Sequence, residues 1–70
     1  MNTFTLPTGR KVTKNAEFCV AVKARSRWST QFFKSYKGAQ NEYRRLRVYC
    51  ADKDMCAYYG LQDYKMIRPD

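Results

Sequence analysis

The stretch KGAQNEYRRLRVYCA, residues 37–51, decides the fold because its pattern is compatible with either a strand or a helix. Read as a strand, it places alternating tyrosines and arginines on one face, a surface suited to gripping RNA. Read as a helix, it gives a stripe of small and apolar residues three and four positions apart, with the arginines directed at water. The stripe consists of Ala39, Tyr43, Leu46 and Cys50. This spacing favours the helix.

The start of the helix depends on WSTQFFKSYK, residues 28–37, into which the same spacing extends. A single helix from Ser29 to Gly60 would be far longer than is usual in a small domain. It would also enclose Gly38, which costs about 1 kcal/mol relative to alanine. We therefore expect a strand followed by a helix that begins near Gly38, with an early helix over residues 29–37 as the open alternative.

The sequence after residue 51 predicts how the helix ends. Asp52, in the ADKD run, is a suitable N-cap and is able to divide the helix in two. Gly60 lies where a left-handed residue commonly stops a helix. The segment YKMIR, residues 64–68, then alternates Tyr64, Met66 and Arg68 with two other residues, as a final strand would.

The N-terminal half predicts further strands. TFTLPTGRKVT, residues 3–13, is typical of a hairpin around a Pro-Thr-Gly turn. AEFCVAVKAR, residues 16–25, alternates as a half-buried strand does. Its inward positions are Phe18, Val20, Val22 and Ala24, and we expect Trp28, Phe32 and Tyr36 to face the helix with them.

The fold class predicted from these segments is α+β, in a single domain over residues 1–70. It has a small antiparallel sheet in the order β-hairpin, β, β, α, β. One helix, broken or unbroken near Asp52, packs on one face. A chain of 70 residues buries only about 60% of its unfolded surface, so a thin stability margin is expected.

The charge predicts a polyanionic partner. Fourteen Lys and Arg against six Asp and Glu give a formal net charge of +8. Residues 1–37 hold eight bases and one acid, a net +7, whereas residues 38–70 hold six bases and five acids, a net +1. Such an excess attracts nucleic acid or an acidic protein surface.

The sheet face away from the helix is the predicted contact surface. Basic groups, one exposed ring and small polar donors along it match the needs of phosphate contact, base stacking and base-edge contact. The predicted site residues are Arg10, Lys11, Lys23, Arg25, Arg27, Gln31, Phe33 and Lys37, with Ser35 beside them.

The helix carries a secondary set of binding candidates. Their simplest interpretation is a solvated face with local pairing, such as Glu42 with Arg45. The alternative is a helix that grips phosphate, which Glu42, Asp52 and Asp54 on the same segment weaken. These secondary candidates are Arg44, Arg45, Arg47 and Tyr49.

Several function classes lack support in the sequence. The chain has no histidine, and Cys19, Cys50 and Cys56 do not have zinc-site spacing, so we expect free thiols, no metal and no cofactor. No catalytic residue, phosphate loop or small-molecule substrate is indicated. No apolar run approaches a membrane span. A cytoplasmic, non-enzymatic protein of unknown oligomeric state is the expectation.

Two functions fit these features. The first is a small nucleic-acid-binding protein that uses a basic and aromatic sheet face. The second is a protein inhibitor or modulator, of the kind encoded by phages and mobile elements, that docks on an acidic surface of host nucleic-acid machinery. The FCVAV and YKMIRP strands resemble in layout the ββαβ order of small phage inhibitors of bacterial RNA polymerase, a resemblance of element order that no residue motif supports.

Overall fold

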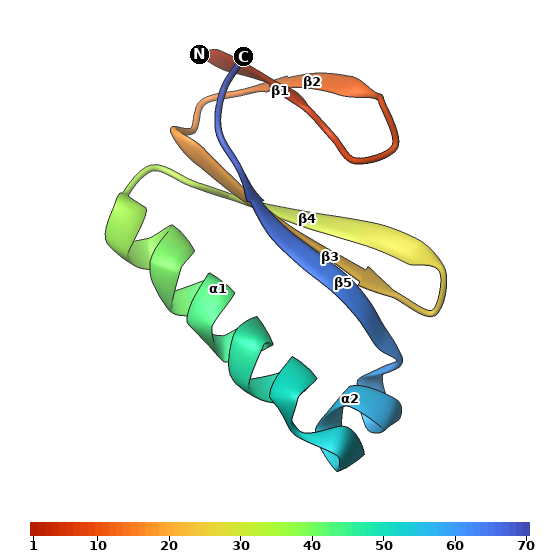
Figure 1. Ribbon diagram of the computed structural model, residues 1–70. Helices are drawn as coiled ribbons and strands as arrows, with labels where there is room; N and C mark the ends of the chain where they lie inside the picture. The colour runs from red at the N-terminus through yellow and green to blue at the C-terminus, as the bar shows by residue number, and fades with distance from the viewer.

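The computed structural model describes residues 1–70 as five strands and two helices in the order β, β, β, β, α, α, β (Figure 1). The α+β prediction is confirmed, including the strand in the ambiguous segment before the helix. The elements are β1 Asn2–Thr5, β2 Lys11–Lys14, β3 Phe18–Ala24, β4 Arg27–Phe33, α1 Tyr36–Ala51, α2 Lys53–Tyr59 and β5 Leu61–Ile67.

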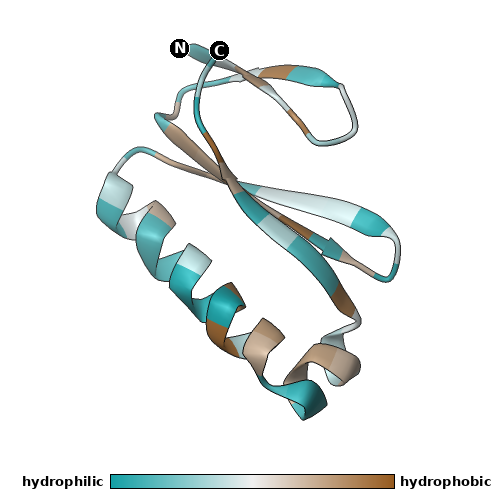
Figure 2. Cartoon of the chain, viewed as in Figure 1, coloured by the Kyte–Doolittle hydropathy of each residue, from teal (hydrophilic) through white to brown (hydrophobic).

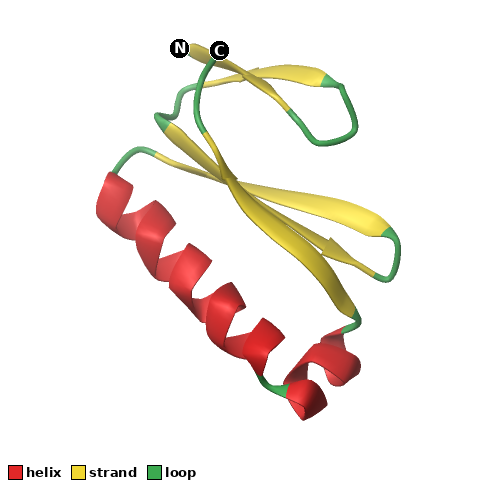
Figure 3. Cartoon of the chain, viewed as in Figure 1, coloured by secondary structure: helices red, strands yellow, loops and turns green.

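The strands form two antiparallel sheets, whereas the sequence predicted one. The hairpin β1–β2 is a separate two-stranded sheet (Figure 3). The other strands are ordered β4-β3-β5. The hairpin and α1 lie on opposite sides of the three-stranded sheet (Figure 1). The chain ends lie together because Asp70 N–H donates to the Thr3 carbonyl over 2.9 Å.

The β3–β4 turn corrects the predicted face assignment. Arg25 and Ser26 have φ of 51° and 67°, as a two-residue turn between twisted strands requires. Ala24 therefore pairs with Arg27, and every even position of β3 lies opposite an odd position of β4. Trp28 and Phe32 consequently face away from α1, and Tyr36 lies in α1 itself, contrary to the prediction.

The central strand β3 is buried on both faces over residues 19–21 and only partly buried over its remaining residues, whereas a strand half-buried along its length was predicted. Val20 packs with Ala39 and Leu46 of α1 on the helix side. On the other side Cys19 packs with Phe4, and the hairpin supplies this second core. Figure 2 shows that α1 is mostly hydrophilic, in keeping with a single narrow buried stripe.

The ends of the two helices lie at or close to the residues that the sequence predicts. Ser35 caps α1 by accepting from Gly38 N–H at 3.2 Å, so the helix begins two residues before the expected start. Asp52 breaks the helix and caps α2 by accepting from Asp54 N–H at 2.9 Å, as predicted. Gly60 stops α2 with φ of 66°, also as predicted.

Burial of the Cys19 thiol gives a prediction about stability and pH. Cys19 is fully buried, and burial raises its pKa above the ordinary value of 9.0. The unfolded chain loses this proton first, so the contribution to stability is complete below pH 9.0 and is lost as the pH rises further. Urea unfolding at increasing pH should show a shallower decline for Cys19→Ala than for the wild type. Parallel declines would contradict the assignment.

Candidate nucleic-acid interface

The structure does not gather the predicted sheet-face residues on one surface. Lys23 lies on the face opposite α1, in register with Trp28 of β4 and Asp63 of β5. Gln31 and Phe33 lie on the helix side, opposite Val20 and Phe18 of β3 in register, and Phe33 packs against the helix-side core. The expected grouping of Lys23 with Gln31 and Phe33 is therefore wrong. The reason is that the two-residue turn pairs odd positions of β3 with even positions of β4, so residues of the two strands with the same parity lie on opposite faces.

The other predicted residues are dispersed as well. Arg25 holds the β3–β4 turn to the end of α2: its Nη2 donates to the Tyr58 carbonyl at 3.1 Å. Arg10 lies in the hairpin loop and Lys11 at the start of β2. Arg27 is exposed on the helix side of β4. The predicted Ser35 and Lys37 lie at the start of α1.

Two of the secondary binding candidates, in contrast, line the same cleft as a third arginine. Arg44 and Arg47 of α1 and Arg68, just beyond β5, line one cleft of about 430 Å³, which we call the arginine cleft. All three side chains are exposed. The remaining lining residues are Tyr36, Gln40, Tyr43 and Met66. The cleft brings Arg68 together with Arg44 and Arg47, which lie 24 and 21 positions earlier in the chain.

Arg68 is the charged residue of the cleft that was not predicted from the sequence, and Tyr36 and Gln40 of the cleft were not predicted as site residues either. The signal for Arg68 was the alternation with Tyr64 and Met66, which puts it on the helix-facing side of the final strand. Its guanidinium carbon lies 5.6 Å from the centroid of the Phe18 ring, a cation–π contact. Phe18 in turn meets Tyr36 edge to face, with centroids 5.5 Å apart. Arg68 thus contacts an aromatic ring of β3 while it lines the cleft.

No carboxylate lines the arginine cleft. The one ion pair of the protein joins Arg45 to Glu42 at 2.6 Å, and neither residue lines the cleft. The nearby acid Asp70 is bound to β1, where its carboxylate accepts from Thr5 Oγ1 at 2.9 and 2.8 Å. The positive charge of the cleft is therefore not neutralised within the protein.

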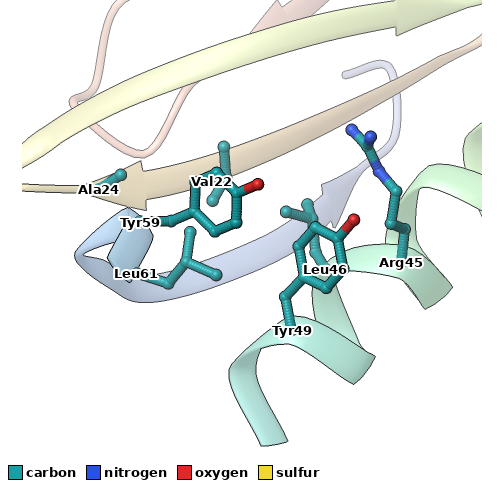
Figure 4. A pocket seen from close by; sticks show the side chains of 7 residues that line it. All are labelled: Val22, Ala24, Arg45, Leu46, Tyr49, Tyr59 and Leu61. Carbon is teal, nitrogen blue, oxygen red and sulfur yellow. The ribbon is translucent and has the colours of Figure 1, made fainter. Parts of the chain in front are cut away.

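The other two secondary candidates belong to a different hollow. Arg45 and Tyr49 line a pocket of about 220 Å³ between α1, α2 and the sheet, which we call the apolar pocket (Figure 4). Tyr49 stacks on Tyr59 with centroids 5.6 Å apart and planes at 7°. The rest of the lining is Val22, Ala24, Leu46, Tyr59 and Leu61. The four secondary candidates are thus divided between two sides of α1.

Other kinds of site are not apparent. No three His, Cys, Asp or Glu side chains come close enough to hold a metal ion, and the three cysteines are free. Neither helix has the length and apolar character that crossing a membrane requires. Comparison with protein-family models, with curated proteins and with solved structures found no match to the chain.

Proposed function

We propose that this protein is a non-enzymatic nucleic-acid-binding domain that holds the phosphate backbone in the arginine cleft. The observation that carries the proposal is the convergence of Arg44, Arg47 and Arg68 on a hollow without a carboxylate. Three free thiols suit action in the reducing cytoplasm.

Arginine suits this role for physical reasons. Its planar guanidinium donates two parallel hydrogen bonds to a phosphate, and it stays charged at every physiological pH. Neutralising phosphates releases condensed counterions, which drives binding at low salt. Arginines already paired with carboxylates, such as Arg45, have less to gain from this exchange.

The proposal moves the interface from the sheet to the flank of α1. The sheet-face interpretation needed Lys23, Gln31 and Phe33 on one surface, and they lie on two. The arginine cleft keeps the predicted chemistry, basic groups beside aromatic rings, and places it between the helix and the end of β5.

Binding of the intact chain to labelled DNA and RNA, measured by fluorescence anisotropy at increasing salt, tests the proposal. Three phosphate contacts predict that log K falls against log salt with a slope of about −2 or steeper. Absence of salt-dependent binding to every single strand and duplex tested, by protein that circular dichroism shows to be folded, would overturn it.

The apolar pocket supports a second candidate, a modulator that docks on an acidic surface of a host protein such as RNA polymerase. Tyr49 at the pocket is the expected anchor of such a complex. Tyrosines buried at the centre of a protein–protein interface often contribute much of the binding energy. Affinity capture after nuclease treatment separates the two functions. A stoichiometric protein partner that survives nuclease and is lost with Tyr49→Ala would favour the modulator.

A further inference from the structure

We infer, on the basis of the proposed function, that the arginine cleft takes a single strand of nucleic acid in preference to a duplex. The inference rests on three features of the cleft: its concave shape, its exposed aromatic ring and its polar amide.

The first feature is shape. The cleft residues of α1 form one stripe, which is a flank of the helix turned toward the end of β5. They line a hollow, whereas readout of a duplex groove needs a helix or ribbon that projects into it. Tyr36 and Arg47 are eleven positions apart, so the stripe is about 16 Å long. A hollow of this length suits a few nucleotides of one strand.

The second feature is the ring of Tyr36. It lines the cleft at the N-terminal end of α1 and is 47% exposed. It meets Phe18 at an interplanar angle of 64°, an edge-to-face contact. An unpaired base gains stacking energy on an exposed ring, whereas the bases of a duplex are already stacked on each other.

The third feature is the amide of Gln40, one helical turn after Tyr36 on the same stripe. Glutamine both donates and accepts hydrogen bonds, as the edge of an unpaired base requires. Tyr36, Gln40 and Arg44 therefore present a ring, an amide and a guanidinium in succession. These match a base face, a base edge and a phosphate.

The test compares a labelled single strand of mixed sequence, about 20 nucleotides long, with the duplex made from it. Anisotropy at one fixed salt concentration should give at least about 10-fold tighter binding to the single strand. Tyr36→Ala should weaken single-strand binding by about 5- to 100-fold without a change in salt slope, and should leave duplex binding unaltered.

Two variants serve as controls. Tyr36→Phe keeps the ring and should retain single-strand affinity, which shows that the ring and not the hydroxyl is required. Unaltered duplex binding by Tyr36→Ala excludes a folding defect in that variant. Tyr58→Ala removes a 71% exposed ring of α2 outside the cleft and should have no effect. Equal or tighter binding of the duplex, or full single-strand affinity in Tyr36→Ala, would overturn the inference. The proposed function would survive either result. It fails if no nucleic acid is bound, or if replacement of the cleft arginines leaves binding unchanged.

Discussion

Replacement of all three cleft arginines, as Arg44→Ala/Arg47→Ala/Arg68→Ala, should weaken binding to single-stranded nucleic acid by about 100-fold at about 0.1 M salt. Each lost phosphate contact removes about 0.7 from the salt slope, so the slope should become shallower by about 2. Anisotropy titrations at several salt concentrations measure both quantities. The loss should be uniform across base sequences, because phosphate contacts carry no sequence information.

A charge-matched variant distinguishes a site from a general effect of net charge. Arg10→Ala/Lys11→Ala/Arg27→Ala also removes three positive charges, but from residues that were predicted to bind and that lie outside the cleft. We expect it to lose much less affinity than the cleft variant. Equal losses would contradict a localised site, and a larger loss would place the interface on the hairpin and β4. Thermal unfolding checks that loss of the Arg68–Phe18 contact has not unfolded the cleft variant.

Phe4→Ala should lower the free energy of unfolding by about 3–5 kcal/mol. Phe4 is fully buried and meets Phe32 of β4 edge to face, with centroids 5.4 Å apart. It also shares a core with Cys19 of β3, so the cavity would open between the two sheets. A domain of 70 residues has about 4–10 kcal/mol of stability in total. Urea unfolding followed by circular dichroism measures the loss.

Tyr58→Ala is the matched control because it removes another large ring from an exposed position. Its stability should stay within about 0.5 kcal/mol of the wild type. A small effect of Phe4→Ala would show that the hairpin is not part of the cooperative unit. A large effect would also mean that loss of the hairpin changes the position of Arg68 in the cleft, because Asp70, two residues later, is bound to Thr5 of β1.

The secondary structure was largely predictable because its signals are local. Asp52 and Gly60 delimit α2, and the spacing of Ala39 and Leu46 marks the buried stripe of α1. The errors concern features that join distant segments. The predicted face of Trp28 is wrong because Arg25 and Ser26 alone form the turn between β3 and β4. The length of a turn decides which positions of neighbouring strands share a face.

The sequence predicted the kinds of residue in the candidate site, basic groups beside aromatic rings, but not its position in the fold. Clustered charge pointed to the N-terminal half, yet the cleft uses Arg44 and Arg47 from the half with a net charge of only +1. Whether a positive group is free depends on its neighbours in space, as the pairing of Arg45 with Glu42 illustrates. Counting charges along the chain does not contain that information.

The amino-acid sequence by itself determined the class of fold, the order of its elements, the ends of its helices and the excess of positive charge. Each of these depends on residue type and on spacing within a few positions. Only the tertiary structure decided that the hairpin forms a second sheet, that β3 is buried on both faces and that Arg68 joins Arg44 and Arg47. These features arise when segments far apart in the chain pack together, and there strand register and the position of α1 on the sheet select which side chains meet.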